Sequence, residues 1–243
     1  MTDILENINI ILPSKEIENN IYHKWELMDK PKHSLGDIEK IVAKYGAMIG
    51  NELPNVLKPA MLLMCGDHGI AKYGVSAYPP EVTIQMINGY MRGTAGANVM
   101  ARYANTDLFV VDIGVNADLS HFEGVRNEKV AFGTEDFTKG PAMTKEQAVK
   151  ALQVGIKVAD ECIDKGYNLL VTAEMGIGNT TSTAAIASAM LKLSPELTVG
   201  RGTGINDERL QIKRRVVAEG LAVNAPIADD ALDVLCKLGG YDH

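Results

Sequence analysis

The chain has 243 residues, of which 46% are hydrophobic and 23% charged, and this composition is ordinary for a globular protein with one large or two small domains. The formal net charge of −7 disfavours nucleic acid and anionic membrane surfaces as partners. The sequence shows no apolar run long enough to span a bilayer and no signal peptide, so we expect neither a membrane nor a nucleic-acid partner.

The three cysteines, Cys65, Cys162 and Cys236, are odd in number and far apart. This pattern favours reduced thiols over a disulfide framework and therefore a cytoplasmic location. No cluster of cysteine and histidine has the spacing of a zinc site, so we expect no structural metal.

The first fifth of the chain is predicted to be helical. Ser14 is placed to cap a helix that extends to Met28, with apolar residues at near-helical spacing. Ser34 is expected to cap a second amphipathic helix, which Gly50 ends. Because no strand precedes these helices, they form either a small subdomain or an arm that packs on a neighbouring subunit.

The first predicted strand, Pro59–Cys65, is apolar throughout, as a strand covered on both faces would be. Asp67 and His68 follow its carboxyl end, which is where open α/β sheets bind ligands. Both are therefore candidate site residues. The alternative is an ordinary loop in which His68 hydrogen-bonds a nearby carbonyl group.

The next segment combines a rigid loop with a helix that is expected to run from Glu81 to about Arg102. Its side chains could line a pocket for a flat heterocycle, and the candidates are Ser76, Tyr78, Gln85 and Met86. The alternative is that they serve only loop rigidity and core packing.

A second strand is predicted at Leu108–Ile113. The polar, glycine-rich residues 116–141 are expected to form a long loop, with a short strand near Val130. Thr144 and Gln147 resemble a capping box at the start of a long helix.

The third strand, Leu169–Ala173, leads into a glycine turn and a helix start rich in hydroxyl groups. The first turn of a helix has unpaired N–H groups and a partial positive charge, which suits an anion. We therefore predict an anion site at Gly176, Gly178, Asn179, Thr180 and Thr181. Glu174 lies beside it, and either it has a role there or it faces water in an ordinary strand-to-helix turn.

A second glycine cluster, Gly200–Gly204, precedes a helix that Asn206 or Asp207 caps. A glycine loop at a helix start offers backbone N–H groups to a phosphate, and nearby lysine adds positive charge. We predict a second phosphate cradle here, made of Gly202, Thr203, Gly204 and Lys213.

Five ordered segments resemble the nicotinate-nucleotide–dimethylbenzimidazole phosphoribosyltransferase family of cobalamin synthesis. They are Asp67–Gly69, Gly74–Pro79, Glu174–Thr181, Gly200–Gly204 and Leu238–Asp242. The resemblance implies an α/β fold, with a Rossmann-like parallel sheet flanked by helices in residues 53–243 and a small helical subdomain or arm in residues 1–52. It also implies a homodimer.

The resemblance implies a reaction in which a nitrogen of 5,6-dimethylbenzimidazole, or a related base, attacks C1′ of nicotinate mononucleotide. Nicotinate leaves and α-ribazole 5′-phosphate forms with inverted configuration. No cofactor or metal is needed. The two glycine clusters and Lys213 would hold the phosphoribosyl group, and the base would lie among Asp67, His68, Ser76, Tyr78, Gln85 and Met86. Glu174 is the candidate catalytic residue, because it could face the ribose or the oxocarbenium-like C1′.

The sequence departs from the family in one respect. Family members continue past the segment that ends here at Asp242 and His243, and the resemblance places the general base in a later Gly-Glu-Gly-type motif. Only three strands are convincing, and doubly wound sheets usually have more. We therefore expect an incomplete sheet and the N-terminal two-thirds of such an enzyme.

Two other functions compete with this interpretation. The chain could be a catalytically impaired or non-catalytic nucleotide- or azole-binding fragment of the same family. A Rossmann dehydrogenase is disfavoured, because the turn from Gly176 to Gly178 lacks the third glycine and the later acidic residue of a dinucleotide site.

Overall fold

The computed structural model describes residues 10–55 and 57–243. The chain divides into two compact units, Met1–Leu57 and Lys58–His243, and we describe each by itself. Within the described residues, no helix has the length and the apolar character needed to cross a membrane.

The first unit contains α2 (Lys15–Glu26) and α3 (Asp37–Ile49). The predicted cap of the first helix is confirmed, because Ser14 Oγ accepts a hydrogen bond from the Ile17 backbone at 3.3 Å. The predicted cap at Ser34 is wrong: its N–H bonds to Pro31 in a turn, and α3 begins after Gly36, whose φ of +57° suits glycine.

The second unit is built on a parallel sheet with the strand order β3-β2-β1-β4. The strands are β1 (Pro59–Gly66), β2 (Asp107–Gly114), β3 (Arg126–Asn127) and β4 (Leu169–Met175). Leu62 of β1 pairs with Phe109 on one side and Thr172 on the other. The parallel pairing confirms the predicted α/β class, and β3 is the short strand that was predicted near Val130.

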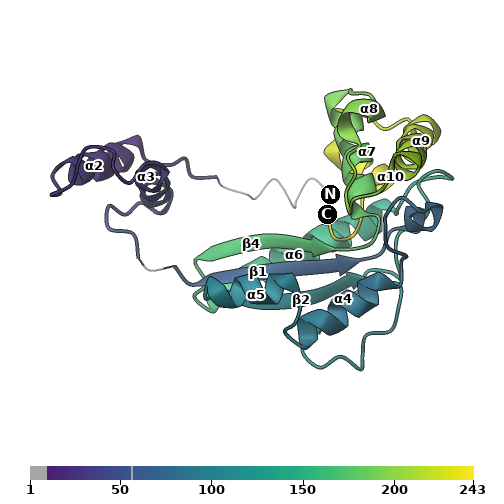
Figure 1. The fold of residues 1–243 in the computed structure, drawn as a ribbon, viewed down its shortest axis with the longest axis horizontal. Helices are drawn as coiled ribbons and strands as arrows, with labels where there is room; N and C mark the ends of the chain where they lie inside the picture. The colour runs from purple at the N-terminus through teal and green to yellow at the C-terminus, as the bar shows by residue number, and fades with distance from the viewer. Residues whose placement is uncertain (1–9, 56) are drawn as a thin grey trace. The chain divides into compact units, whose positions relative to one another are not determined.

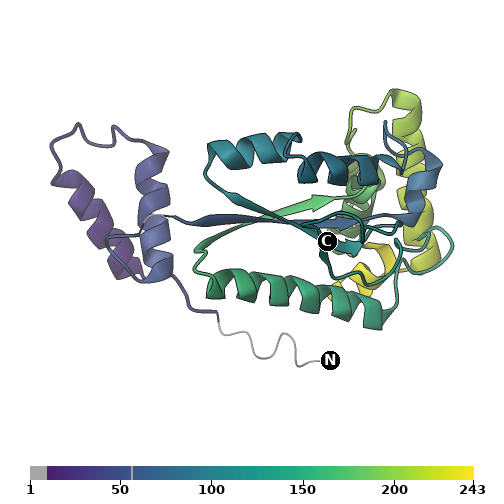
Figure 2. The ribbon, with the colours of Figure 1, turned by 90° about the horizontal axis from the view of Figure 1, so that it is seen from below.

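Helices cover both faces of this sheet (Figure 2). One face carries α4 (Val82–Met91) and α5 (Gly96–Tyr103), and the other carries α6 (Lys145–Asp164). The single helix predicted from Glu81 to Arg102 is wrong, because the chain turns at Gly93, whose φ is +71°. Arg102 closes this turn with a 2.7 Å hydrogen bond to the Gly93 carbonyl. The capping box at Thr144 and Gln147 is confirmed.

Alternating side chains of the strands fill two cores. Leu62 and Val111 pack toward α6, where they meet Val158, and Leu63 and Val110 pack toward α4. Such alternation follows from the two-residue period of a strand. Both faces of the central strands are therefore buried in apolar cores. Polar groups concentrate where the strands end.

The remaining helices form a third layer beyond the carboxyl ends of β1 and β4 (Figure 1). They are η1 (Gly69–Tyr73), α7 (Asn179–Leu191), α8 (Pro195–Thr198), α9 (Asp207–Asn224) and α10 (Ala231–Leu238). Their core surrounds Phe137, Val216 and Leu238, which are at most 1% exposed. This layer positions the first turn of α7 and the loop before α9, which carry the two predicted glycine motifs.

A candidate phosphoribosyl site at the carboxyl ends of β1 and β4

The site begins where β1 and β4 end side by side, with Cys65 opposite Met175. The next residues, Gly66 and Gly176, approach so closely that a Cβ atom on Gly176 would lie 1.8 Å from the Gly66 carbonyl oxygen. Only glycine fits this approach. The close contact turns the chain from β4 directly into α7 and places the first turn of that helix at the carboxyl edge of the sheet.

Glu174 and Asn179 are linked across this turn. The Asn179 side chain donates to Glu174 Oε2 and accepts a 2.6 Å hydrogen bond from the Thr180 backbone. Glu174 is exposed to solvent on β4, and Asn179 thus holds its carboxylate beside the helix start. A carboxylate in this place can interact with a cationic or hydroxyl-bearing ligand. Whether it has a catalytic role stays a prediction.

Lys213 is the buried cation of the site. It is 1% exposed, and its Nζ donates a 2.7 Å hydrogen bond to Thr180 Oγ1. Burial lowers the pKa of Lys213 to about 8, because the charged ammonium group loses its hydration. A bound anion would stabilise a buried ammonium group of this kind, because it would compensate the positive charge.

The two predicted phosphate cradles meet at one place. A Cβ atom on Gly202 would lie 2.9 Å from Thr180 Oγ1 and 3.2 Å from Lys213 Nζ, so the second glycine loop touches the first motif. The sequence analysis predicted that both glycine clusters and Lys213 hold the phosphoribosyl group, and the structure brings Gly202, Thr180 and Lys213 together. The first turn of α7, a glycine loop and a cation then converge as a phosphate requires.

Ser76 and Thr203 join the predicted base segment to this cradle. Their hydroxyl oxygens lie 3.1 Å apart, and Thr203 Oγ1 also accepts from the Ala77 backbone at 2.9 Å. Arg209 fixes the same loop through a 2.7 Å hydrogen bond to the Ser76 carbonyl. The segment that begins at Ser76 therefore borders the glycine loop before α9.

The other members of the predicted base pocket lie in different environments. Tyr78 and Gln85 are exposed, whereas Met86 is partly buried against the core between α4 and the sheet. Gly204 has a φ of +87° in the loop before α9, and Thr181 is fully buried in α7. Base binding by Tyr78, Gln85 and Met86 stays a prediction.

Asp67 has both carboxylate oxygens occupied. Oδ1 accepts from Thr83 Oγ1 at 2.7 Å, and Oδ2 accepts from the Asn116 backbone at 2.8 Å. Burial raises the pKa of Asp67, while these hydrogen bonds oppose the shift. The described contacts of Asp67 join the end of β1 to α4 and to the loop after β2. Its proposed contact with a base stays a prediction.

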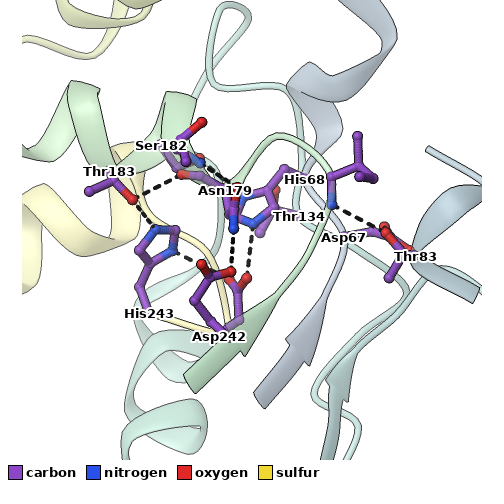
Figure 3. A network of polar contacts seen from close by, with 12 residues as sticks. Asp67, His68, Thr83, Thr134, Asn179, Ser182, Thr183, Asp242 and His243 are labelled. Carbon is purple, nitrogen blue, oxygen red and sulfur yellow. Dashed lines mark hydrogen bonds and ion pairs between the residues drawn. The ribbon is translucent and has the colours of Figure 1, made fainter. Parts of the chain in front are cut away.

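His68 is buried in a polar network that the sequence did not reveal (Figure 3). Its Nδ1 lies 3.1 Å from Ser182 Oγ and its Nε2 lies 3.1 Å from Asp242 Oδ2. Burial disfavours the charged ring, but the Asp242 carboxylate outweighs this effect and raises the pKa of His68. The neighbouring histidines likewise outweigh burial and hold the pKa of Asp242 well below its usual range.

Sequence reasoning missed Ser182, Thr183 and His243 as members of this network. His68 and Asp242 are 174 positions apart, so no spacing rule could pair them. The one signal was the segment Leu238–Asp242, which the family resemblance singled out without giving it a role. The expected alternative, a bond from His68 to a loop carbonyl, is not what the structure shows: its ring contacts a hydroxyl group and a carboxylate.

Comparisons with known proteins give the family of the chain. A family model described as "Phosphoribosyltransferase" matches residues 10–243. The nicotinate-nucleotide–dimethylbenzimidazole phosphoribosyltransferase of Chloroflexus aggregans is 41% identical over the whole chain, and that of Geobacter sulfurreducens is 44% identical. The chain spans 69% of the length of each of these relatives.

A solved structure shows the same fold. The crystal structure of CobT from Thermus thermophilus superimposes with a TM-score of 0.88 at 38% identity. The match covers 93% of this chain and 68% of that one. The chain therefore belongs to the nicotinate-nucleotide–dimethylbenzimidazole phosphoribosyltransferase family.

Proposed function

We propose that the chain binds nicotinate mononucleotide and transfers its phosphoribosyl group to 5,6-dimethylbenzimidazole or a related base. The products are α-ribazole 5′-phosphate and nicotinate. The observation that carries this proposal is the convergence of Lys213, Thr180 and Gly202 at the first turn of α7. This arrangement offers a cation, a hydroxyl group and backbone N–H groups to a phosphate, in a chain whose relatives carry this activity in their names.

The 5′-phosphate of the nucleotide is assigned to this cradle. Lys213 supplies a charge-assisted hydrogen bond, and the N–H groups of the first turn of α7 supply further donors. Thr181 belongs to the same turn, and Gly178 begins it with a φ of +104°. With the phosphate fixed there, C1′ lies within reach of side chains at the carboxyl edge of the sheet.

Glu174 is proposed to face the ribose or C1′. Positive charge develops at C1′ as the bond to nicotinate breaks, and a carboxylate held by Asn179 can stabilise it. The incoming base is proposed to lie along the segment from Ser76 to Met86, because Ser76 borders the cradle through Thr203. The enzyme then has to position two reactants and help the base to lose its proton.

A homodimer and a cytoplasmic location belong to the same proposal. The first unit exposes apolar side chains along α3, including Ile38, Ile41 and Met48, which are more than half exposed. Such a face is suited to contact with a second copy. The three cysteines are free, which suits a reducing compartment.

The alternative is a member of the family that binds its substrates but transfers the phosphoribosyl group slowly or not at all. The observation that favours it is that the Gly-Glu-Gly-type motif, in which the family resemblance places the general base, is not found in these 243 residues. Binding without turnover would support this alternative.

The experiment is to incubate the chain with nicotinate mononucleotide and dimethylbenzimidazole and to identify the products by mass spectrometry and NMR. The proposal predicts nicotinate and the α anomer of the ribazole phosphate in equal amounts, dependent on both substrates. Release of nicotinate without the base would indicate hydrolysis instead. No product from a chain that binds both substrates would support the alternative.

A further inference from the structure

A second cluster of polar side chains lies beside the phosphate cradle and is not used by the proposed reaction. His68, Asp242 and His243 face one another at the carboxyl edge of the sheet, with Ser182 and Thr183 of α7 next to them (Figure 3). One ligand atom from each of the three residues lies within 4.8 Å of the other two. From this geometry we propose that His68, Asp242 and His243 bind a divalent transition-metal ion of the Zn²⁺ type.

The donor set is that of a zinc or cobalt site. Two imidazole nitrogens and one carboxylate oxygen are ligands that these ions accept, with bonds of about 2.0–2.1 Å. Ligand atoms at that distance from a tetrahedral ion lie about 3.3–3.4 Å from one another. His68 Nε2 lies 3.1 Å from Asp242 Oδ2, and His243 Nδ1 lies 3.3 Å from Asp242 Oδ1. Each histidine nitrogen is therefore at about the required ligand–ligand distance from one of the two Asp242 oxygens.

The Asp242 carboxylate carries an unsatisfied oxygen. Its side chain is 0% exposed, and Oδ1 has only the ion-pair contact with His243, without a well-directed hydrogen bond from the described part of the chain. A buried charged acceptor without such a bond is costly. A metal ion would satisfy this oxygen and would neutralise the buried charge.

Gly240 lies directly against the cluster. A Cβ atom there would lie 2.3 Å from Asp242 Oδ1, 2.3 Å from the His68 ring and 2.7 Å from His243 Nδ1. Any side chain at position 240 would therefore collide with all three groups. The absence of a side chain at Gly240 lets the three groups pack directly against the backbone there and stay close to one another.

The outer nitrogen of each histidine is held by a hydroxyl group. Ser182 Oγ lies 3.1 Å from His68 Nδ1, and Thr183 Oγ1 lies 2.9 Å from His243 Nε2. Metal-bound histidines usually have such a partner on the second nitrogen, because it fixes the ring and its tautomer. These contacts leave His68 Nε2 and His243 Nδ1 as the nitrogens directed at Asp242.

A cavity borders the cluster on the side of α6. It is lined by Gly240, Asp242 and His243 together with Met64, Ile113 and Ala151. The side chains of His68 and Asp242 are closed to solvent and that of His243 is 15% exposed, so we place the water molecule that would complete a four-coordinate site beside His243. The sequence-based expectation of no metal rested on local spacing, and these ligands come from two segments far apart in the chain.

The ion is assigned a role in holding structure and not in the reaction. It would link His68, which follows β1, to Asp242 and His243, which follow α10. Ser182 and Thr183 connect the two histidines to α7. The same first turns of α7 form the phosphate cradle. Metal binding should therefore stabilise the fold around the cradle, because a ligand that binds only the folded state raises its free energy of unfolding.

The test uses the whole chain without a polyhistidine tag, stripped of metal with a chelator. Zn²⁺ binding is measured by isothermal titration calorimetry, and Co²⁺ serves as a coloured probe of tetrahedral coordination. We expect one ion per chain, a visible Co²⁺ spectrum of the tetrahedral type, and a rise in thermal midpoint with added Zn²⁺. His243→Ala should lower the affinity by about 10–100-fold or more, because it removes one of three protein ligands.

His121→Ala is the matched control, because that histidine is exposed and lies outside the cluster. It should leave binding unchanged. The His243 side chain is 15% exposed whereas those of His68 and Asp242 are 0% exposed, so the loss of His243 should not prevent folding even if Asp242→Asn does. The proposal would be overturned if the chain bound no stoichiometric ion or if His243→Ala bound it as tightly as the parent chain. Loss of binding in His121→Ala would also overturn it, because the ion would then be bound by a surface histidine.

Discussion

Lys213 Nζ donates a 2.7 Å hydrogen bond to Thr180 Oγ1, which joins the second turn of α9 to the first turn of α7. Burial alone lowers the pKa of Lys213, and no acidic side chain contributes to the shift. The charge is therefore kept inside the protein with a hydroxyl group as its hydrogen-bond partner. This relationship brings two glycine loops together at one candidate anion site.

Replacing Lys213 with methionine should weaken the binding of nicotinate mononucleotide by about tenfold or more. The substitution keeps the length of the side chain and removes one charge-assisted contact, worth roughly 1.5–3 kcal/mol. Calorimetric titration measures the effect. Arg215→Met is the control, because Arg215 is on the same helix but exposed and paired with Glu219. Equal affinities of the parent chain and Lys213→Met would contradict the assignment.

Binding of the nucleotide should weaken as pH rises through about 8. Burial lowers the pKa of Lys213 to about 8, so the ammonium group is charged below this pH and loses its proton above it. The phosphate is already a dianion above about pH 7, because its second pKa is near 6. Titrations between about pH 7 and pH 9.5 should therefore report the lysine and not the phosphate. In Lys213→Met this dependence should disappear; its persistence would assign the titration to another group.

Replacing Gly176 with alanine should lower the free energy of unfolding by about 1–3 kcal/mol, as overpacking does. The new Cβ atom would lie 1.8 Å from the Gly66 carbonyl oxygen and 3.0 Å from Asp242 Oδ2, so β1 and β4 would have to separate. Urea denaturation measures the loss.

Gly155→Ala provides the matched control, because no atom lies within 4 Å of a Cβ atom built there in α6. Alanine is favoured over glycine inside a helix by about 1 kcal/mol, so this variant should be as stable as the parent or more stable. A Gly176→Ala chain as stable as Gly155→Ala would show that the close approach of the two strand ends is not required.

The elements that were predicted well are those with strong local signals. The apolar strands at residues 59, 108 and 169 and the capping box at Thr144 depend on neighbouring residues, and they are where the sequence places them. The helix from Glu81 was predicted to be too long, because a small-residue run around Gly93 does not reveal a turn closed by Arg102.

The site was predicted only in part, for a physical reason. The glycine turn before α7 and the loop before α9 have local signatures, but their convergence on Lys213 depends on how α7 and α9 pack. The His68–Asp242 contact depends on the end of the chain returning to the first strand. Neither relationship leaves a pattern within any short stretch of sequence.

These 243 residues, assayed alone, should form α-ribazole phosphate more slowly than a full-length relative such as that of Geobacter sulfurreducens, by roughly 10²–10⁴-fold. The general base that the family resemblance implies lies in a motif not found here, and the chain spans 69% of that relative. Glu174→Gln should lower the remaining rate further. Supplying the remainder of the relative in trans should raise it. A rate equal to that of the relative, unchanged in Glu174→Gln, would place the base elsewhere in these residues.

The most direct test of the phosphoribosyl site is a crystal structure of the chain with nicotinate mononucleotide and dimethylbenzimidazole bound. We predict the 5′-phosphate within hydrogen-bonding distance of Lys213 Nζ and of the backbone N–H groups at the first turn of α7. The base should lie against the segment from Ser76 to Met86, with its attacking nitrogen directed at C1′ near Glu174. Density for the phosphate at any other place, with the cradle of Thr180, Gly202 and Lys213 unchanged, would contradict the account.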